Sequence, residues 1–239
     1  MSSFADLWVY LATEPLLWLT VTLAAYAVAH RISVASGNHP LVNPVLLSVL
    51  FLVGVLSLSE TPFEVYFEGA QFIHFMLGPA TVALAIPLVR NAASVRRKLP
   101  AIVAALAAGS ATAVLSTVFI ADVLGAPRSV TVSLASKSAT MPIAMSVSEP
   151  LGGIVTLTAV LVIATGILGA IVVTPLMNAL GIKDYAARGF AAGLASHGIG
   201  TARAFAVSPT AGLFAGIALG LNGLVTVFLV PPLVRFLLG

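Results

Sequence analysis

Long apolar stretches, separated by short polar connections, run through the whole chain. Most are near the roughly 20 residues that a helix needs to cross the hydrocarbon core of a bilayer. The pattern predicts such helices at about residues 15–29, 41–58, 68–89, 99–121, 151–177, 189–207 and 210–238. The segment 129–148 is polar for a span, and it either crosses or re-enters the membrane. The chain is therefore predicted to be an all-α, polytopic membrane protein with about seven or eight transmembrane segments.

Composition supports the same class. Of the 239 residues, 59% are hydrophobic and 8% are charged, whereas a soluble domain has about 25% charged residues. So few ionised groups cannot cover the surface of a water-soluble fold, and the surplus apolar area is expected to face lipid. The net charge is only +3, and the Lys and Arg residues lie at span ends, which argues against a nucleic-acid partner.

The sequence lacks the patterns of metal, cofactor and enzyme chemistry. It has no cysteine, and its four histidines lie far apart, so neither a metal nor a cofactor is expected. No Ser/His/Asp order, paired catalytic carboxylates or HExxH motif is present. Ser196 and His197 are adjacent, which does not make them a nucleophile and its base. The protein is therefore not expected to be an enzyme.

Basic residues predict how the chain is oriented. Arg90, Arg96, Arg97 and Lys98 lie in the short connection between the third and fourth predicted spans. The positive-inside rule places this connection in the cytoplasm. The acidic Glu60–Glu68 connection and the N-terminus are then external, and the side of the C-terminus stays open.

Two predicted spans contain helix-breaking residues, at Gly78-Pro79 and at Gly198–Gly200. Both breaks open a G-x-x-T pattern, which ends at Thr81 and Thr201 and gives an offset of 201 − 81 = 120 residues, about half the chain. Paired interruptions in corresponding halves are typical of transporters. Two independent kinks would explain the same residues equally well.

The offset of 120 residues between the two patterns also predicts how the chain is divided. We expect one membrane domain, residues 1–239, with two or more broken helices. An internal repeat would divide it into halves at about 1–124 and 125–239.

A broken helix exposes backbone N–H groups, which in a membrane must be buried in protein or line a cavity. The half-helix after a break also directs the positive end of its dipole into the gap, an arrangement that binds carboxylates and phosphates. We therefore predict that a small organic anion binds near the bilayer midplane, between the breaks. The predicted binding residues are Gly78, Pro79, Thr81, Lys137, Ser138, Thr140, Ser196, His197, Gly198, Gly200, Thr201 and Arg203.

Three of these residues, Lys137, His197 and Arg203, are basic groups inside apolar segments. A charge within a membrane is costly, so each is expected to meet a partner or a ligand. The hypothesis is that they balance the charge of an anionic substrate. Alternatively, Lys137 pairs with Glu149 or Asp122, Arg203 extends to the interface, and His197 is a hydrogen-bonded interior residue.

Asp122 and Glu149 are also the acids nearest to membrane depth, so a proton-coupled cycle could use either of them. For Asp122 the simpler interpretation is a solvated span end. Glu149 precedes Pro150, and its role is left open.

Three segments carry a resemblance to a known family. They are LGPATVALAIPL at 77–88, KSATMPIAMSVSEPLGG at 137–153 and GLASHGIGTARAF at 193–205. Together they resemble the LrgB/CidB family over nearly the whole chain, from about Pro15 to Val234. Ala139 and Met141 depart from the family pattern, in which Val and Thr are common at these positions.

The resemblance implies an integral protein of the bacterial cytoplasmic (inner) membrane and two functions. One is transport of small monocarboxylates such as glycolate, glycerate and pyruvate, as in the related part of plastidal glycolate/glycerate translocators. The other is antiholin- or holin-like regulation of murein hydrolase activity and cell lysis. That role would involve a separate small membrane protein of the LrgA/CidA type.

Between the two functions, the broken segments with buried cations favour a carrier. A holin-like pore needs only a few apolar spans that oligomerise. Small-xxx-small patterns such as Ala105–Gly109 fit internal packing and homo-oligomerisation equally well.

Overall fold

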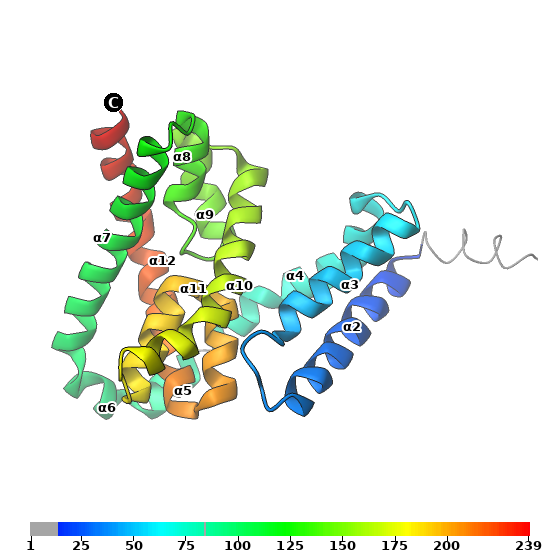
Figure 1. Cartoon of the computed structure of the whole chain (residues 1–239), viewed down its shortest axis with the longest axis horizontal. Coiled ribbons are helices and arrows are strands. Elements are labelled where there is room, and N and C mark those ends of the chain that lie inside the picture. The colour runs from blue at the N-terminus through cyan, green and yellow to red at the C-terminus, as the bar shows by residue number, and fades with distance from the viewer. Residues whose placement is uncertain (1–13, 84) are drawn as a thin grey trace, which may run out of the picture. The chain divides into compact units, whose positions relative to one another are not determined.

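The computed structural model describes residues 14–83 and 85–239, and every regular element among them is a helix (Figure 1). This confirms the predicted all-α class. The chain divides into two compact units, one ending at Ile86 and the other beginning at Pro87. The expected halves at about 1–124 and 125–239 stay a prediction. Each unit is described by itself below.

Within the described residues, four helices are long and apolar enough to cross a membrane. They are α2 (Pro15–Ala35), α7 (Leu99–Val123), α10 (Val155–Ala179) and α12 (Pro209–Leu238). The apolar helix α3 (Pro44–Leu58) is shorter, with 15 residues. These helices fit an integral membrane protein, whereas the count of seven or eight spans stays a prediction.

The N-terminal unit packs α2 against α3 and α4 (Phe63–Ala83). Helix α2 begins at Pro15, as predicted, because proline at the first helical position lacks only an N–H that would have no partner there. Asn43 caps α3 by accepting hydrogen bonds from the backbone N–H groups of Val45 and Leu46. Trp18 is fully buried and meets Tyr66 edge-to-face, with 5.9 Å between ring centroids.

The expected break at Gly78-Pro79 is not found, because α4 continues through both residues to Ala83. A proline inside a helix removes one backbone hydrogen bond, but membrane helices tolerate this where the freed carbonyl finds another partner. The prediction overestimated the effect of one proline. Two short helices follow, α5 (Ala85–Arg90) and α6 (Ala92–Arg97), and lead into α7.

In the C-terminal unit, the segment after α7 forms a helical hairpin. Helix α8 (Arg128–Ala135) and helix α9 (Met141–Ser148), with a final 3-10 turn at Glu149–Leu151, are its arms. The arms are antiparallel: Ser136 at the end of α8 donates a hydrogen bond to the carbonyl of Ala144 at 3.0 Å. Both arms contact the start of α10: Ser133 of α8 accepts a hydrogen bond from the N–H of Ile154 at 2.7 Å, and Ser148 of α9 accepts one from the Thr158 hydroxyl at 2.9 Å. Residues 129–148 thus form a hairpin of two short helices, which fits the re-entrant alternative of the prediction.

Helix α11 (Tyr185–Val207) forms a second hairpin. Its backbone leaves the helical conformation at Ser196 (φ −127°, ψ 16°) and His197 (φ 40°, ψ −131°). Gly200 then lies so close to the carbonyl oxygen of Ala192 that a Cβ would clash with it. In a continuous helix, residues eight positions apart would be about 12 Å apart. The chain therefore folds back on itself, two residues before the predicted break.

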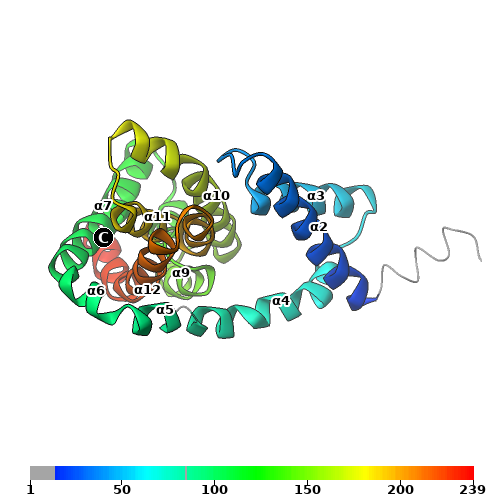
Figure 2. The same cartoon turned by 90° about the horizontal axis from the view of Figure 1, so that it is seen from below.

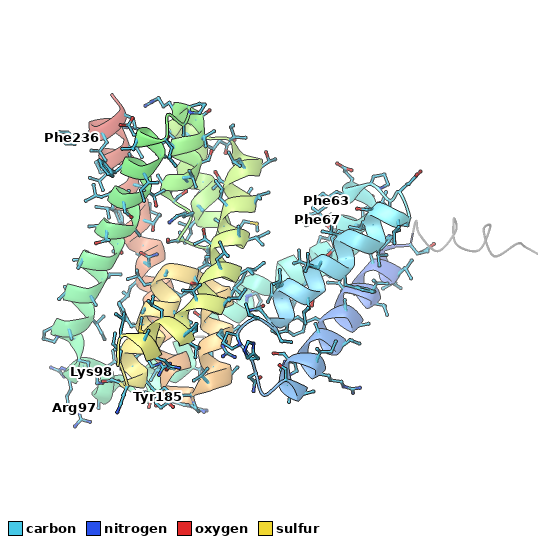
Figure 3. The ribbon with its side chains drawn as sticks, viewed as in Figure 1. Phe63, Phe67, Arg97, Lys98, Tyr185 and Phe236 are labelled. Atoms are coloured by element: carbon cyan, nitrogen blue, oxygen red, sulfur yellow. The ribbon has the colours of Figure 1, made fainter. Side chains whose placement is uncertain are left out.

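The two hairpins enter the unit from opposite ends. The starts of α7 and α11 lie together, since the ammonium of Lys98 and the carboxylate of Asp184 are 3.1 Å apart. The 128–151 hairpin begins beyond the other end of α7, which spans about 37 Å in its 25 residues. Figure 3 shows Lys98 and Tyr185 at one end and Phe236 at the other. We call these the Lys98 end and the Asp122 end.

Small residues hold the second hairpin against its neighbours. Gly189 and Gly193 lie directly on the backbone of Ala211 and Ala215 in α12, where any side chain would clash. Such contacts let helices approach closely within a membrane. In Figure 2, α11 lies between α7 and α10, so the second hairpin occupies the middle of the unit.

Candidate functional site

The tips of the two hairpins meet at a groove of about 730 Å³. Lys137 and Ser138 line it from the 128–151 hairpin, and Ser196 lines it from the 185–207 hairpin. Thr112 of α7 and Thr165 of α10 complete its polar lining, and most other lining residues are small or apolar. Three of the twelve predicted binding residues are thereby brought together, although the chain separates Ser138 from Ser196 by 58 positions (196 − 138).

Lys137 is the one charged side chain among the described residues that line the groove. It is half-buried, at the tip between α8 and α9. Within the described residues it makes no ion pair with Asp122 or Glu149, which are both exposed at the Asp122 end. The alternative that Lys137 serves a structural ion pair with them is therefore not found. The groove carries one positive charge that an anion could balance.

Ser196 supplies a buried hydroxyl that has no hydrogen-bond partner among the described residues. Its residue is 1% exposed, and it lines the groove. Gly169 of α10 leaves the space that this hydroxyl occupies, since a Cβ there would clash with it. A buried polar atom without a partner is costly, so Ser196 is expected to bond whatever occupies the groove.

Asn222 of α12 connects the two tips. Its amide nitrogen donates to the carbonyl oxygens of Ser138, at 3.1 Å, and of Leu194, at 3.2 Å. Its amide oxygen accepts a hydrogen bond from Ser110 of α7 at 2.7 Å. The sequence analysis missed this residue, although a single Asn inside the long apolar segment of α12 was a usable signal.

His197 and Thr201 stabilise the second tip and do not line the groove. The His197 ring packs on Gly166 of α10, and its Nε2 is 2.9 Å from the carbonyl oxygen of Val162. Thr201 donates a hydrogen bond from its hydroxyl to the carbonyl of His197 at 2.8 Å. A non-glycine residue rarely adopts the positive φ of His197, so these contacts hold a strained reversal. His197 fits the alternative of a hydrogen-bonded interior residue.

Arg203 lies away from the groove, in the second arm of the 185–207 hairpin. It lines a cavity of about 20 Å³ together with Arg188 and Tyr185, both from the start of α11. The two basic candidates are thus separated, with Lys137 at the groove and Arg203 toward the Lys98 end.

The other predicted residues have separate places. Thr140 is half-buried at the N-cap of α9, Gly198 is exposed, and Gly200 packs against the first arm. Gly78 and Pro79 belong to the N-terminal unit, and the side chain of Thr81 lies outside the described residues. A shared site between these residues and the second hairpin therefore stays a prediction.

Two helix N-termini reach the tips, because α9 begins at Met141 and the second arm of α11 begins after His197. Their backbone N–H groups carry partial positive charge, which favours an anion nearby. With Lys137 and the Ser196 hydroxyl, the tips offer hydrogen-bond donors and one full positive charge. Such an arrangement can hold a small anion with one negative charge.

Comparisons with known proteins agree with this membrane architecture. The model of the LrgB-like family matches residues 22–236. The uncharacterized protein YwbG of Bacillus subtilis is 36% identical over 195 residues, which cover 82% of this chain and 87% of YwbG. The holin-like protein CidB of Staphylococcus epidermidis is 29% identical over 221 residues, covering 92% and 96% of the two chains. No solved structure matches.

Proposed function

This chain belongs to the LrgB-like family, and from that premise we propose that it is a secondary carrier of small organic monocarboxylates. The substrates would resemble glycolate, glycerate or pyruvate, and the membrane would be the bacterial inner membrane. The observation that supports this most is the groove at the meeting point of the two hairpin tips. It combines one lysine and several hydroxyls, and two helices begin within a few residues of its lining, at Met141 and after His197.

The chemistry of a carboxylate fits this groove. An anion that leaves water loses strong hydration, and the site must replace it with hydrogen bonds and a countercharge. Lys137 supplies the countercharge, and the Ser196 hydroxyl supplies a donor that the protein itself leaves unused. The apolar lining suits the short carbon chain of a monocarboxylate, and a dicarboxylate would bring a second charge without a partner.

Coupling of transport to an ion would involve acids outside the groove. Asp122 and Glu149 are exposed at the Asp122 end, outside the groove. If protons drive transport, they would reach these acids from that side and not from the substrate site. The positive-inside rule puts the Lys98 end in the cytoplasm, so any role of Asp122 and Glu149 would lie at the external entrance.

A holin-like role is a second candidate, because relatives that cover most of this chain are named holin-like proteins. In that role the chain would regulate murein hydrolase activity and lysis, together with a separate LrgA/CidA-type membrane protein. The two roles are compatible, since altered flux of an organic acid could change cell-wall lysis indirectly. Homo-oligomerisation and a surrounding lipid bilayer belong to either role.

Uptake into proteoliposomes tests the carrier. The purified chain should accumulate at least one of labelled pyruvate, glycolate and glycerate. Lys137→Gln should weaken apparent affinity roughly 10- to 100-fold, as expected for one lost charge-assisted hydrogen bond. Lys183→Gln, at an exposed position in the connection to α11, is the matched control. Arg203→Gln should change affinity less than about twofold, since its cavity is separate.

Two results would reject the proposal. One is the absence of uptake of all three acids by protein that is monodisperse and folded. The other is uptake by Lys137→Gln at the wild-type affinity. Dye release from the same liposomes, without selective uptake, would instead support the holin-like role.

A further inference from the structure

A second hollow, of about 450 Å³, lies between α7 and the first arm of the 185–207 hairpin. Ala101 and Ala105 line it from α7, and Phe190 lines it from α11. At its outer end, Lys98 pairs with Asp184 and lies 5.4 Å from the centre of the Phe214 ring. We call this hollow the vestibule, and it opens at the Lys98 end.

The vestibule and the groove are neighbours along α7. Gly109, Leu194 and Ala195 line both of them. The hollow from the Lys98 end therefore continues toward the groove, and these three residues form the partition between the two.

Leu194 closes the partition. Its side chain packs on Gly109, where an added Cβ would lie 3.0 Å from the nearest Leu194 methyl carbon. Leu194 is 8% exposed, so its contact with Gly109 closes the buried side of the partition, while Ala195 lies exposed beside it. A packed leucine without polar atoms opposes the passage of an ion, because a charge cannot keep its hydration there.

Asn222 holds this leucine from the other side. Its amide nitrogen donates to the Leu194 carbonyl as well as to that of Ser138. Leu194 lies two residues before Ser196, where the backbone reverses. A movement of the second tip would therefore shift Leu194 and lengthen its hydrogen bond to Asn222, while Asn222 could keep its bonds to Ser110 and Ser138.

We propose that the 185–207 hairpin is the gate on the Lys98 side, with Leu194 as its seal against Gly109 and Asn222 as its latch. This proposal rests on the proposed carrier function and extends it to the route of the substrate. When the second tip moves, Leu194 leaves Gly109, and the groove connects to the vestibule. Asn222 is a positioning residue here, since it acts through the backbone of the hairpin.

Cysteine accessibility tests this gate without any substrate, because the chain contains no cysteine. Ala105→Cys reports the vestibule, and Thr112→Cys reports the groove. A membrane-impermeant cationic thiol reagent is added to proteoliposomes from the side on which Ala105→Cys reacts. In the otherwise wild-type chain, Thr112→Cys should react more slowly than Ala105→Cys from that side.

Asn222→Leu and Leu194→Ala should each speed labelling of Thr112→Cys at least about fivefold, the shift expected for one lost hydrogen bond or seal contact. Labelling of Ala105→Cys should not change. Two matched controls should leave Thr112→Cys slow. Thr226→Val removes a buried hydroxyl in α12 that bonds only within its own helix, to the carbonyl of Asn222. Leu115→Ala truncates an exposed side chain of α7 that lines neither hollow.

Equal labelling rates of Thr112→Cys in all five backgrounds would overturn the gate, and so would wild-type Thr112→Cys reacting as fast as Ala105→Cys. If Asn222→Leu does not fold, Leu194→Ala decides alone. The outcome also separates the two proposals. Faster labelling without acid uptake would support the gate and reject the carrier, whereas acid uptake with uniform labelling would reject only the gate.

Discussion

The two hairpins that meet at the groove are built by different means. Side-chain hydrogen bonds hold the 128–151 hairpin: Ser136 bonds the carbonyl of Ala144, and Ser148 accepts a bond from Thr158 of α10. Close backbone contacts at glycines hold the 185–207 hairpin, as at Gly189 and Gly200. Both hairpins have directional bonds to their surroundings, since Asn222 and the Val162 carbonyl bond the second one, but the second depends in addition on glycines that admit no side chain.

The two hairpin tips also differ in charge and in backbone strain. The first tip runs over Ser136–Thr140, between the ends of α8 and α9, and presents the Lys137 charge to the groove. The second tip reverses within Ser196 and His197, carries no charged side chain and stores strain at His197. We infer from this contrast that the first hairpin provides the charge and that the second hairpin is the part that moves.

The largest expected effect concerns the glycine contacts of the 185–207 hairpin. Gly200→Val should destabilise the protein by about 3 kcal/mol or more, since the new side chain meets the backbone of Ala192 and cannot rotate away. Thermal unfolding in detergent measures this. Gly198→Ala, at an exposed position with open space around it, is the control and should have little effect. Equal stability of both variants would contradict the close packing of the two arms.

A smaller effect distinguishes binding from folding at the second tip. Ser196→Ala should change the free energy of unfolding by less than about 0.5 kcal/mol, because its hydroxyl has no partner in the described protein. Apparent affinity for the transported acid should fall about fivefold, the equivalent of one hydrogen bond. Uptake kinetics in proteoliposomes give this value. Ser146→Ala, whose exposed hydroxyl bonds only its own helix, should leave affinity unchanged.

If Ser196→Ala instead lost stability and kept its affinity, the hydroxyl would belong to the packing of the hairpin. The role of Lys137 as the countercharge would be unaffected. The proposed contact between Ser196 and the substrate would be rejected.

The smallest effect concerns the outer end of the second hairpin. The N–H of Ala186, and then the ammonium of Lys98, hold the pKa of Asp184 below its usual range. A lowered folded-state pKa means that the charged carboxyl stabilises the protein above the unfolded pKa, and that this contribution is lost as pH falls through the folded pKa. Asp184→Asn should therefore cost less than about 1 kcal/mol at pH 7, because the pair is exposed.

The comparison across pH checks the sign. Thermal unfolding of the wild type and of Asp184→Asn should differ at neutral pH and converge in acid, below the range in which Asp titrates. A difference that grew in acid would contradict the assigned role of the carboxylate.

Several features of this protein followed from local sequence. Apolar content and span length predicted an all-α membrane protein, and Pro15 marked the start of α2. Polar or glycine-rich composition marked the two segments that became hairpins. Each of these signals depends on a few neighbouring residues and on their transfer from water to lipid, so it can be read without knowing the fold.

Other features depended on the tertiary structure. Gly78-Pro79 looked like a break and lies in a continuous helix, whereas Ser196 and His197 reverse the chain without any proline. Whether a backbone bends depends on which neighbours accept its freed hydrogen bonds and how closely they pack, and both come from distant segments. Asn222 is the clearest case, because its role depends on hydrogen bonds to two backbone carbonyls. These carbonyls are 84 and 28 residues away in the sequence, and only the folded chain brings them to Asn222.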